Sequence, residues 1–204
     1  PPAVFIPVAE ECNLIVELGH WILQEACRFG RKLQNMGLGH IHLSVNVSVK
    51  EWLSDDFVQT VLTTLEREHF PKQMLTLEIV ETILIENFQI VTEKMQLLQE
   101  QGIRISLDDF GTGYSSLTYL SKLPVNTVKI DKFFIDALPQ EKKYISIVRT
   151  VIDLSHEMGF DVVSEGVESE AQMQLLRTLN CDKIQGYFIS RPLPEAAVLK
   201  KYGR

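Results

Sequence analysis

The chain has 204 residues, of which 45% are hydrophobic and 23% are charged, a composition that is ordinary for a globular protein of one domain or two small ones. Its formal net charge of −7 argues against a surface for nucleic-acid polymers, which needs clustered Lys and Arg. No apolar stretch is long enough to span a bilayer and no signal segment stands at the start, so we expect no membrane contact. The three cysteines lack CxxC spacing, which suggests neither disulfides nor a zinc site. We therefore expect a cytoplasmic protein.

Two periodicities alternate along the chain. Apolar residues at helical spacing, such as Leu14, Leu18 and Ile22, predict helices, whereas every-second patterning, as in "HIHLSVNVS", predicts strands. Gly102 and Gly159 stand where two of the helices are expected to end. The predicted elements in chain order are helix Glu11–Leu33, strand 40–48, helix Lys50–Phe70, strand 74–80, helix Glu86–Gln101, strand 103–108, a short helix around Ser115–Leu120, strand 126–131, helix Lys142–Met158, strand 160–166, helix Ser169–Leu179, strand 183–188 and helix Glu195–Lys200.

Six strands that alternate with helices predict an α/β fold with a parallel sheet, either left open or closed as a barrel. Open doubly wound sheets carry nearly continuous apolar strands, because helices cover both of their faces. Here one face of each strand is apolar and the other admits Ser, Thr, Asn, Glu, Asp and Lys. This pattern favours a TIM-like (β/α) barrel over the open sheet. Nothing marks a second domain, so residues 1–204 are predicted to form a single one.

Polar side chains gather near the carboxyl ends of the predicted strands, mostly opposite the apolar face. A single carboxylate at a strand end is usually a solvated cap. Several that point into one barrel mouth need compensation, because a buried charge without a partner costs several kcal/mol. Barrel enzymes place their chemistry at this end. The residues concerned are Asn46, Glu78, Asp108, Lys129, Glu165 and Gln185.

Four carboxylates stand at or near these strand ends, but only one cation, Lys129, stands beside them. One lysine cannot neutralise four negative charges, whereas divalent metal ions can. Hard oxygen ligands together with the amide oxygen of Asn46 suit Mg²⁺ or Mn²⁺ rather than zinc. Asp108 and Asp109 are adjacent where the chain bends, so that one carboxylate could lie between two ions about 3.5–4 Å apart, the usual arrangement for in-line attack on a phosphoester. The four carboxylates are those of Glu78, Asp108, Asp109 and Glu165.

The stretch "DDFGTGYSS" follows the third strand. Its Gly111 and Gly113 are a weak indication of a phosphate-binding loop, because a third glycine is missing. A tightly turned loop over the strand ends, with Ser115 and Ser116 near the start of the next helix, is the better interpretation. Glu81 has two interpretations: it is a carboxylate at a helix start, or it accepts hydrogen bonds from the glycine loop and fixes the loop's position.

The chain carries, in order, "FIPVAEE", "SVNVS", "LEIVET", "DDFGTGYSSL", "LPVNTVKIDKFF", "SEGVES" and "QGYFISRPLP". Together these motifs resemble those of EAL-domain cyclic-di-GMP phosphodiesterases over essentially the whole chain. The resemblance implies a barrel related to the TIM fold, with one antiparallel strand, that binds cyclic di-GMP across its carboxyl end. Active members of the family use two Mg²⁺ or Mn²⁺ ions to hydrolyse one phosphodiester bond and release linear pGpG.

The resemblance also implies roles for individual residues. Asn46, Glu78 and Asp108 match ligands of the first ion, whereas Asp108, Asp109 and Glu165 match those of the second, with Asp108 bridging. Lys129 resembles the residue that holds and polarises the attacking water, and Glu165 has also been assigned as general base. The other matched positions are Asp131 and Gln185, which line the same mouth, Glu81, which anchors the loop Asp109–Ser116, and the loop residues Phe110, Gly111, Thr112, Gly113, Tyr114, Ser115 and Ser116. Because this loop links the active site to the family's dimer interface, a homodimer is expected.

One departure from the family pattern lies at the start of the chain. The family's E-A-L motif, whose glutamate is a ligand of the first ion, lies upstream of "FIP", and this sequence begins at "PPAVFIP". We therefore expect an N-terminally truncated EAL domain without its first two strands, with a regulatory domain upstream in the intact protein. Two other functions are considered: a catalytically inactive receptor for cyclic di-GMP, and an unrelated barrel hydrolase such as a glycosidase, which would explain paired carboxylates but not Lys129 and Asn46 beside them.

Overall fold

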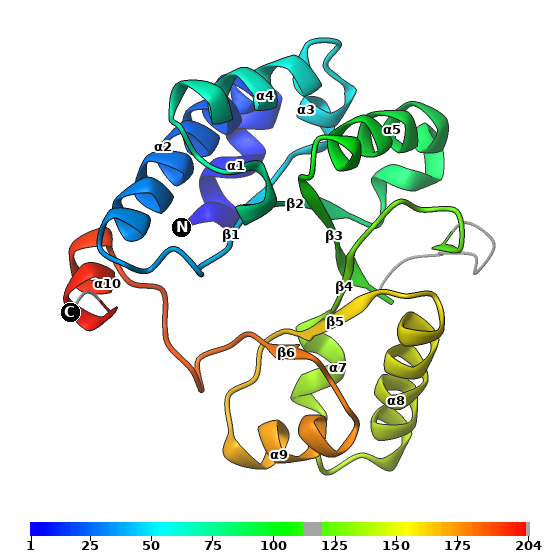
Figure 1. The fold of residues 1–204 in the computed structure, drawn as a ribbon. Helices are drawn as coiled ribbons and strands as arrows, with labels where there is room; N and C mark the ends of the chain where they lie inside the picture. The colour runs from blue at the N-terminus through cyan, green and yellow to red at the C-terminus, as the bar shows by residue number, and fades with distance from the viewer. Residues whose placement is uncertain (112–119, 203–204) are drawn as a thin grey trace. The chain divides into compact units, whose positions relative to one another are not determined.

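A computed structural model describes residues 1–111 and 120–202, with the side chains of residues 84–86 excepted. Its strands follow one another in the sheet in chain order (Figure 1). Every strand pair whose register is defined is parallel, which confirms the predicted α/β class. The strands are β1 (Leu43–Asn46), β2 (Leu75–Val80), β3 (Arg104–Phe110), β4 (Thr127–Ile130), β5 (Asp161–Ser164) and β6 (Lys183–Ile184).

Helices connect these strands, and the chain divides into two compact units. The first unit contains Pro1–Ile79, Glu86–Ile105 and Pro194–Arg204, and the second contains Val80–Ile85 and Ser106–Leu193. The helices are α1 (Pro2–Glu11), α2 (Ile15–Asn35), α3 (Val49–Leu53), α4 (Phe57–Arg67), the 3-10 helix η1 (Lys72–Met74), α5 (Ile83–Glu100), α7 (Lys132–Asp136), α8 (Lys142–Glu157), α9 (Glu170–Thr178) and α10 (Glu195–Tyr202).

The first unit packs α2 against β1, α3 and α4. The apolar stripe of α2 buries Leu23, Cys27 and Leu33, as expected for an amphipathic helix on a sheet. In the adjoining strand pair, β1 and β2 run in register, which places Asn46 beside Glu78 at their carboxyl ends. The packing of α2 therefore supports the strand pair that carries two of the predicted site residues.

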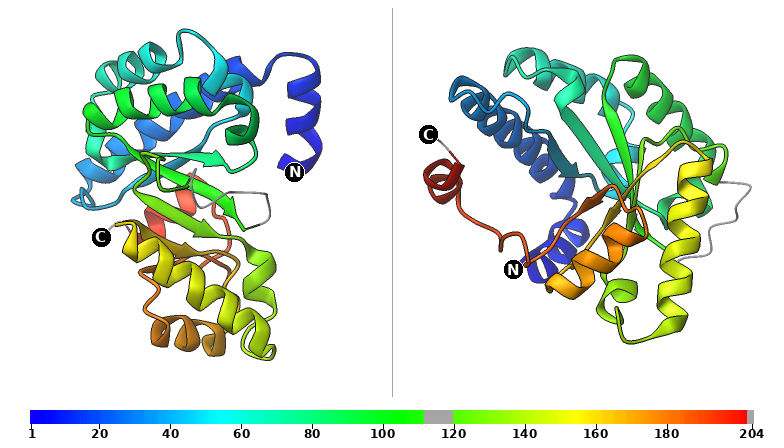
Figure 2. Two further views of the ribbon diagram at one scale, coloured as in Figure 1. Left: turned by 90° about the vertical axis from the view of Figure 1, so that its right-hand side faces the viewer. Right: turned by 60° about the horizontal axis from the view of Figure 1, so that its bottom comes forward.

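The second unit is built on β4 and β5. Helix α8 packs on both of these strands and against α7 (Figures 1 and 2). Burying such a cluster of apolar side chains is the main favourable contribution to folding, at roughly 25 cal/mol per Å². The core residues are Ile130, Ile135, Leu138, Val148, Ile152, Val162, Val167, Leu176 and Leu179. These contacts give β4 and β5, whose ends carry the candidate site, a rigid base.

Two predicted helices are interrupted. Instead of one helix over Glu11–Leu33, α1 ends at Glu11 and α2 begins at Ile15, because Asn13 adopts a left-handed φ of 57°. Instead of one helix over Lys50–Phe70, α3 ends at Leu53, where Ser54 is extended, and α4 begins at Phe57. Helix α1, apart from its last residue Glu11, was not predicted.

The structure differs from the predicted elements at two further places, a helix that was not predicted and a strand that is shorter than expected. The short α7 was not predicted, because five residues are too few to show a helical period; the Asp131 side chain caps it by accepting a hydrogen bond from the N–H of Phe133 at 2.8 Å. The last strand is only Lys183–Ile184, so Gln185 lies just beyond it. The short helix expected around Ser115–Leu120 lies almost wholly outside the described residues.

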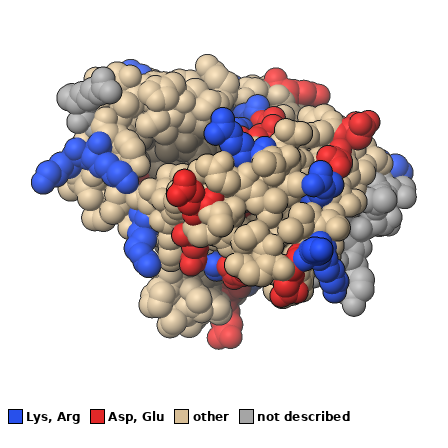
Figure 3. Space-filling model, turned by 90° about the horizontal axis from the view of Figure 1, so that it is seen from below, with Lys and Arg blue, Asp and Glu red and all other residues tan. Residues whose placement is uncertain are grey.

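Charged side chains of both signs are interspersed on the face of the molecule that Figure 3 shows. Among the ion pairs of the chain as a whole, exposed ones such as Lys132 with Glu168 at 2.9 Å and Lys183 with Asp161 at 3.1 Å contribute little to stability. Within the described part of the chain, each helix is too short or too polar to cross a membrane.

The close approach of the segment after β6 to Val167 generates a stability prediction. A Cβ atom on Gly186 would lie 2.1 Å from the carbonyl oxygen of Val167, whose backbone is held by hydrogen bonds to Gln185 and Phe188. We expect Gly186→Ala to lower the free energy of unfolding by roughly 2–3 kcal/mol, measured by urea denaturation. Gly39→Ala is the control, because its Cβ would have only the Cγ of Gln34 nearby, at 4.0 Å. Equal stability of the two variants would contradict this account of the packing.

Candidate functional site

The adjacent carboxylates of Asp108 and Asp109 converge, although successive side chains of a regular strand point to opposite faces. The register between β3 and β4 shifts between Leu107 and Phe110, and Asp109 has a left-handed φ of 54°. This β-bulge turns the second aspartate toward the first. One carboxylate oxygen each from Asp108, Asp109 and Glu165 lie within 4.8 Å of one another.

Lys129 lies beside this cluster as a buried cation. Its Nζ atom is 3.0 Å from Oδ1 of Asp108 and 2.7 Å from Oε1 of Glu165. The strand β4 presents Lys129 between β3, which carries Asp108, and β5, which Glu165 directly follows. A buried ammonium group requires such partners, because its desolvation is otherwise uncompensated. The lysine thus joins the carboxyl ends of these three strands.

The charge of the cluster is only partly balanced. The pKa of Asp109 is raised from its usual value, first by burial and then by the negative charges of Asp108 and Asp131. When Asp109 is protonated, it donates a hydrogen bond to Asp131, which also raises its pKa, whereas the charge of Lys129 opposes the shift. A further positive charge at this position would therefore be stabilised.

The donor set fits a divalent cation. Carboxylate oxygens are the ligands that Mg²⁺ and Mn²⁺ prefer, and a raised carboxyl pKa without a bound cation is expected where several ligands share a site. Within the part of the chain that the structure describes, Asp108, Asp109 and Glu165 are the one group of three or more His, Cys, Asp or Glu side chains close enough to hold a metal ion.

Asn46 and Glu78 lie in the first unit, as neighbours at the ends of β1 and β2. Glu78 is buried and Asn46 is exposed. The carbonyl oxygen of Glu78 accepts a hydrogen bond from the N–H of Val47 at 3.0 Å, which fixes the chain where β1 ends. The parallel register brings this amide and this carboxylate together, as the strand alternation predicted.

Glu81 contacts the start of the glycine loop. It is buried, and its Oε2 atom accepts a hydrogen bond from the N–H of Gly111 at 3.0 Å. Gly111 needs to be glycine, since its φ is 96° and a Cβ would lie 2.9 Å from the ring of Phe134. This is the contact that the anchor hypothesis for Glu81 requires, although the anchoring role stays a prediction. Phe110 is buried at the end of β3, and the predicted loop residues Thr112, Gly113, Tyr114, Ser115 and Ser116 lie outside the described residues.

Asp131 and Gln185 differ in their relation to the cluster. Asp131 approaches Asp109, in keeping with its predicted place in the mouth of the site, and it also caps α7, which was not predicted. Its position two residues after Lys129, on the same face of the strand, agrees with this placement. The side chain of Gln185 is exposed, and its backbone bonds to Ser164 and Val167. The structure therefore brings Asp131 to the carboxylates and shows no contact of Gln185 with them among the described residues.

Comparisons with known proteins agree with this arrangement. The model of the EAL domain family matches residues 1–192. The chain is 41% identical over 194 residues to the signaling protein YkoW of Bacillus subtilis, covering 95% of this chain and 24% of that protein. It is 36% identical over 198 residues to the bifunctional diguanylate cyclase/cyclic di-GMP phosphodiesterase MucR of Pseudomonas aeruginosa, covering 97% of this chain and 29% of MucR.

A solved structure of the MucR phosphodiesterase in complex with c-di-GMP superimposes with a TM-score of 0.93 and 36% identity, covering 97% of this chain and 80% of that one. These similarities confirm the predicted family resemblance and the EAL-type α/β fold. The chain spans between 24% and 32% of the length of the first curated relatives.

The raised pKa of Asp109 generates a pH-dependent prediction. A raised carboxyl pKa in the folded state means that ionisation of Asp109 opposes folding, so its cost is absent below about pH 4 and grows as pH rises through the folded-state pKa. We expect Asp109→Asn to raise the free energy of unfolding of the metal-free chain at pH 7, by up to about 1 kcal/mol because the group is partly exposed. Thermal denaturation from pH 3.5 to 8 measures this difference.

Two comparisons make that measurement decisive. Asp153→Asn, at an exposed position of α8, removes the same charge and should change nothing. Millimolar Mn²⁺ should stabilise the wild-type chain more than Asp109→Asn. A destabilised Asp109→Asn variant at pH 7 in the absence of metal would contradict the electrostatic interpretation.

Proposed function

The chain belongs to the EAL domain family, and from this we propose that it is a metal-dependent phosphodiesterase that hydrolyses cyclic di-GMP to linear pGpG. The observation that supports this proposal is the cluster of Asp108, Asp109 and Glu165 around Lys129. It combines hard metal ligands, which suit the two-metal hydrolysis of a phosphodiester, with a buried ammonium group that can contact an attacking water.

The metal ligands follow from the family and from the cluster. We assign Asp108, Asp109 and Glu165 to one ion, and Asn46, Glu78 and Asp108 to the other. Bound Mg²⁺ or Mn²⁺ ions would supply Lewis acidity and lower the pKa of a water molecule.

The protein side chains would orient the reactants. The Nζ atom of Lys129 already contacts two of the carboxylates, so it is placed to donate a hydrogen bond to an attacking water and to keep that water in line with the scissile bond. Glu165 accepts from Lys129, which holds its carboxylate at the cluster. Glu81 would hold the loop from Asp109 to Ser116 through Gly111, and Asp131 and Gln185 would line the substrate site.

An enzyme is favoured over an inactive receptor by the completeness of this cluster. A receptor for cyclic di-GMP has no need of three converging carboxylates, one of which, Asp109, has a pKa raised by burial and then by the charges of Asp108 and Asp131. We propose in addition that the chain acts in the cytoplasm as a homodimer and as part of a longer protein with a regulatory domain upstream. The length of the curated relatives supports the last of these points.

Incubation of the intact protein with cyclic di-GMP and Mn²⁺, followed by chromatography of the nucleotides, tests the proposal. We expect pGpG to form, and we expect Glu165→Ala to lower the rate at least about 100-fold, because it removes both a metal ligand and the partner of Lys129. Glu168→Ala is the matched control: it removes an exposed glutamate three residues further along, which pairs with Lys132 instead. Tight binding of cyclic di-GMP without turnover in the intact protein would identify a receptor and overturn the proposal.

The E-A-L glutamate leads to a second test. Because the family's first ion takes this glutamate as a ligand, we expect the 204-residue chain to turn over cyclic di-GMP at least about 100-fold more slowly than a form extended upstream through the E-A-L motif. Equal turnover of the two forms under saturating Mn²⁺ would show that the ligands within this chain are sufficient.

A further inference from the structure

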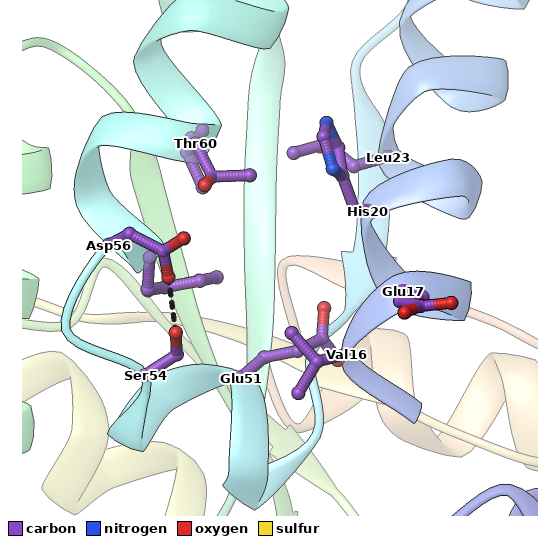
Figure 4. A pocket seen from close by; sticks show the side chains of 10 residues that line it. Val16, Glu17, His20, Leu23, Glu51, Ser54, Asp56 and Thr60 are labelled. Atoms are coloured by element: carbon purple, nitrogen blue, oxygen red, sulfur yellow. Dashed lines mark hydrogen bonds between the residues drawn. The ribbon is translucent and has the colours of Figure 1, made fainter. Parts of the chain in front are cut away.

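A cavity of about 230 Å³ lies within the first unit, between α2 on one side and α3 and α4 on the other (Figure 4). Apolar side chains line part of it, among them Val16, Leu23 and Phe57. Three carboxylates also line it, from Glu17, Glu51 and Asp56. The cavity is separate from the cluster of the second unit in residues and in elements.

Glu51 is the buried member of this set, with 8% of its surface exposed. Its Oε2 atom accepts two hydrogen bonds from Ser48, from the backbone N–H at 2.9 Å and from the hydroxyl group at 2.7 Å. Its Oε1 atom has no hydrogen-bond partner among the described residues. Figure 4 shows a carboxylate oxygen of Glu51 pointing into the space between the helices. This oxygen is not sealed inside the protein, so a donor that enters the cavity can reach it.

Helix α2 makes room for this carboxylate. Gly19 lies in the interior of α2, and a Cβ atom there would lie 1.9 Å from Oε1 of Glu51. A glycine within a helix weakens the helix relative to alanine. Gly19 therefore lowers the stability of α2 at the position where it leaves space for Oε1 of Glu51.

The capping of α3 does not account for the charge of Glu51. Ser48 and Glu51 form a capping box, and the chain contains a second capping box, in which Ser169 pairs with the neutral Gln172 at the start of α9. Both residue types fill the third helical position of such a box equally well. A negative charge gains little from the dipole of α3, which has five residues. Burial raises the pKa of Glu51, which shows that its charge costs energy there.

The rest of the cavity has one sign of charge. Among its ten lining residues, all of them described, there is no Lys or Arg. Asp56 accepts a hydrogen bond from the hydroxyl group of Ser54, and His20 lies 3.4 Å from the hydroxyl oxygen of Thr64. The carboxylates are too far apart to form a group of metal ligands. The cavity therefore combines negative charge with an apolar wall, which suits an organic cation.

We propose that this cavity binds a small aliphatic ammonium ion, which donates a hydrogen bond to Oε1 of Glu51 and packs its alkyl chain against Val16, Leu23 and Phe57. The size of the cavity favours a short alkyl chain over a large aromatic cation. The proposal does not depend on the phosphodiesterase activity, because it concerns only residues of the first unit.

Titration of the 204-residue chain with n-butylammonium chloride, followed by NMR of the backbone amides at constant ionic strength, tests the proposal. We expect saturable shifts at Gly19 and at the residues between α3 and α4, with a dissociation constant in the millimolar range. Butan-1-ol has the same alkyl chain without the charge, so it should produce no saturable shift. Equal binding of the alcohol, or no saturable shift with the ammonium ion, would overturn the proposal.

Glu51→Gln is the informative variant, because glutamine keeps the capping box and removes the charge. It should raise the dissociation constant at least about tenfold. Glu66→Gln, which removes an exposed carboxylate of α4 outside the cavity, should leave binding unchanged. If circular dichroism shows that Glu51→Gln does not fold, Asp56→Asn takes its place and should weaken binding several-fold. Unchanged binding in the folded cavity variant would overturn the proposal.

Discussion

The arrangement of the second unit depends on one buried cation, the ammonium group of Lys129. In the protein interior such a charge is tolerated only with close counter-charges, and Asp108 and Glu165 supply them at 3.0 and 2.7 Å. These two ion pairs join the carboxyl ends of β3, β4 and β5, and the apolar core of the second unit includes Ile130 of β4 and Val162 of β5. The position of the candidate site is therefore set by electrostatics at the strand ends and by packing beneath them.

The bulge at Asp109 adds a carboxylate that these ion pairs do not need. Asp108 and Glu165 already pair with Lys129 without Asp109. The pKa of Asp109 is raised by burial and by the charges of Asp108 and Asp131, and its backbone is left-handed although it is not glycine. Strained backbone of this kind costs about 1–3 kcal/mol and is concentrated at functional sites. Selection for stability alone would not favour Asp109 here, which agrees with the proposal that a cation binds at this position.

Much of this site could be predicted from the sequence, because strand alternation fixes which side chains share a face. Asp108 and Lys129 came together for that reason, and Asn46 lies beside Glu78 because their strands are parallel and in register. The convergence of Asp109 depended on a local φ of 54°, which periodicity does not encode. The break between α3 and α4 likewise involves a residue far away in the sequence. Nζ of Lys94 on α5 donates hydrogen bonds to the carbonyl oxygens of Trp52 and Ser54, at 2.9 and 2.6 Å, and local periodicity does not encode this contact.

Three glutamates, Glu51, Glu78 and Glu81, are buried, and they differ in what balances their charge. Glu81 accepts a hydrogen bond from the N–H of Gly111, and Glu78 lies beside Asn46 at a strand end, so both have a place in the predicted site. Glu51 has a local partner for only one of its two oxygens, and a glycine in α2 leaves space for the other. Because the neutral Gln172 fills the same position in the other capping box, capping alone does not explain the charge of Glu51. A cation in the adjoining cavity would stabilise that charge.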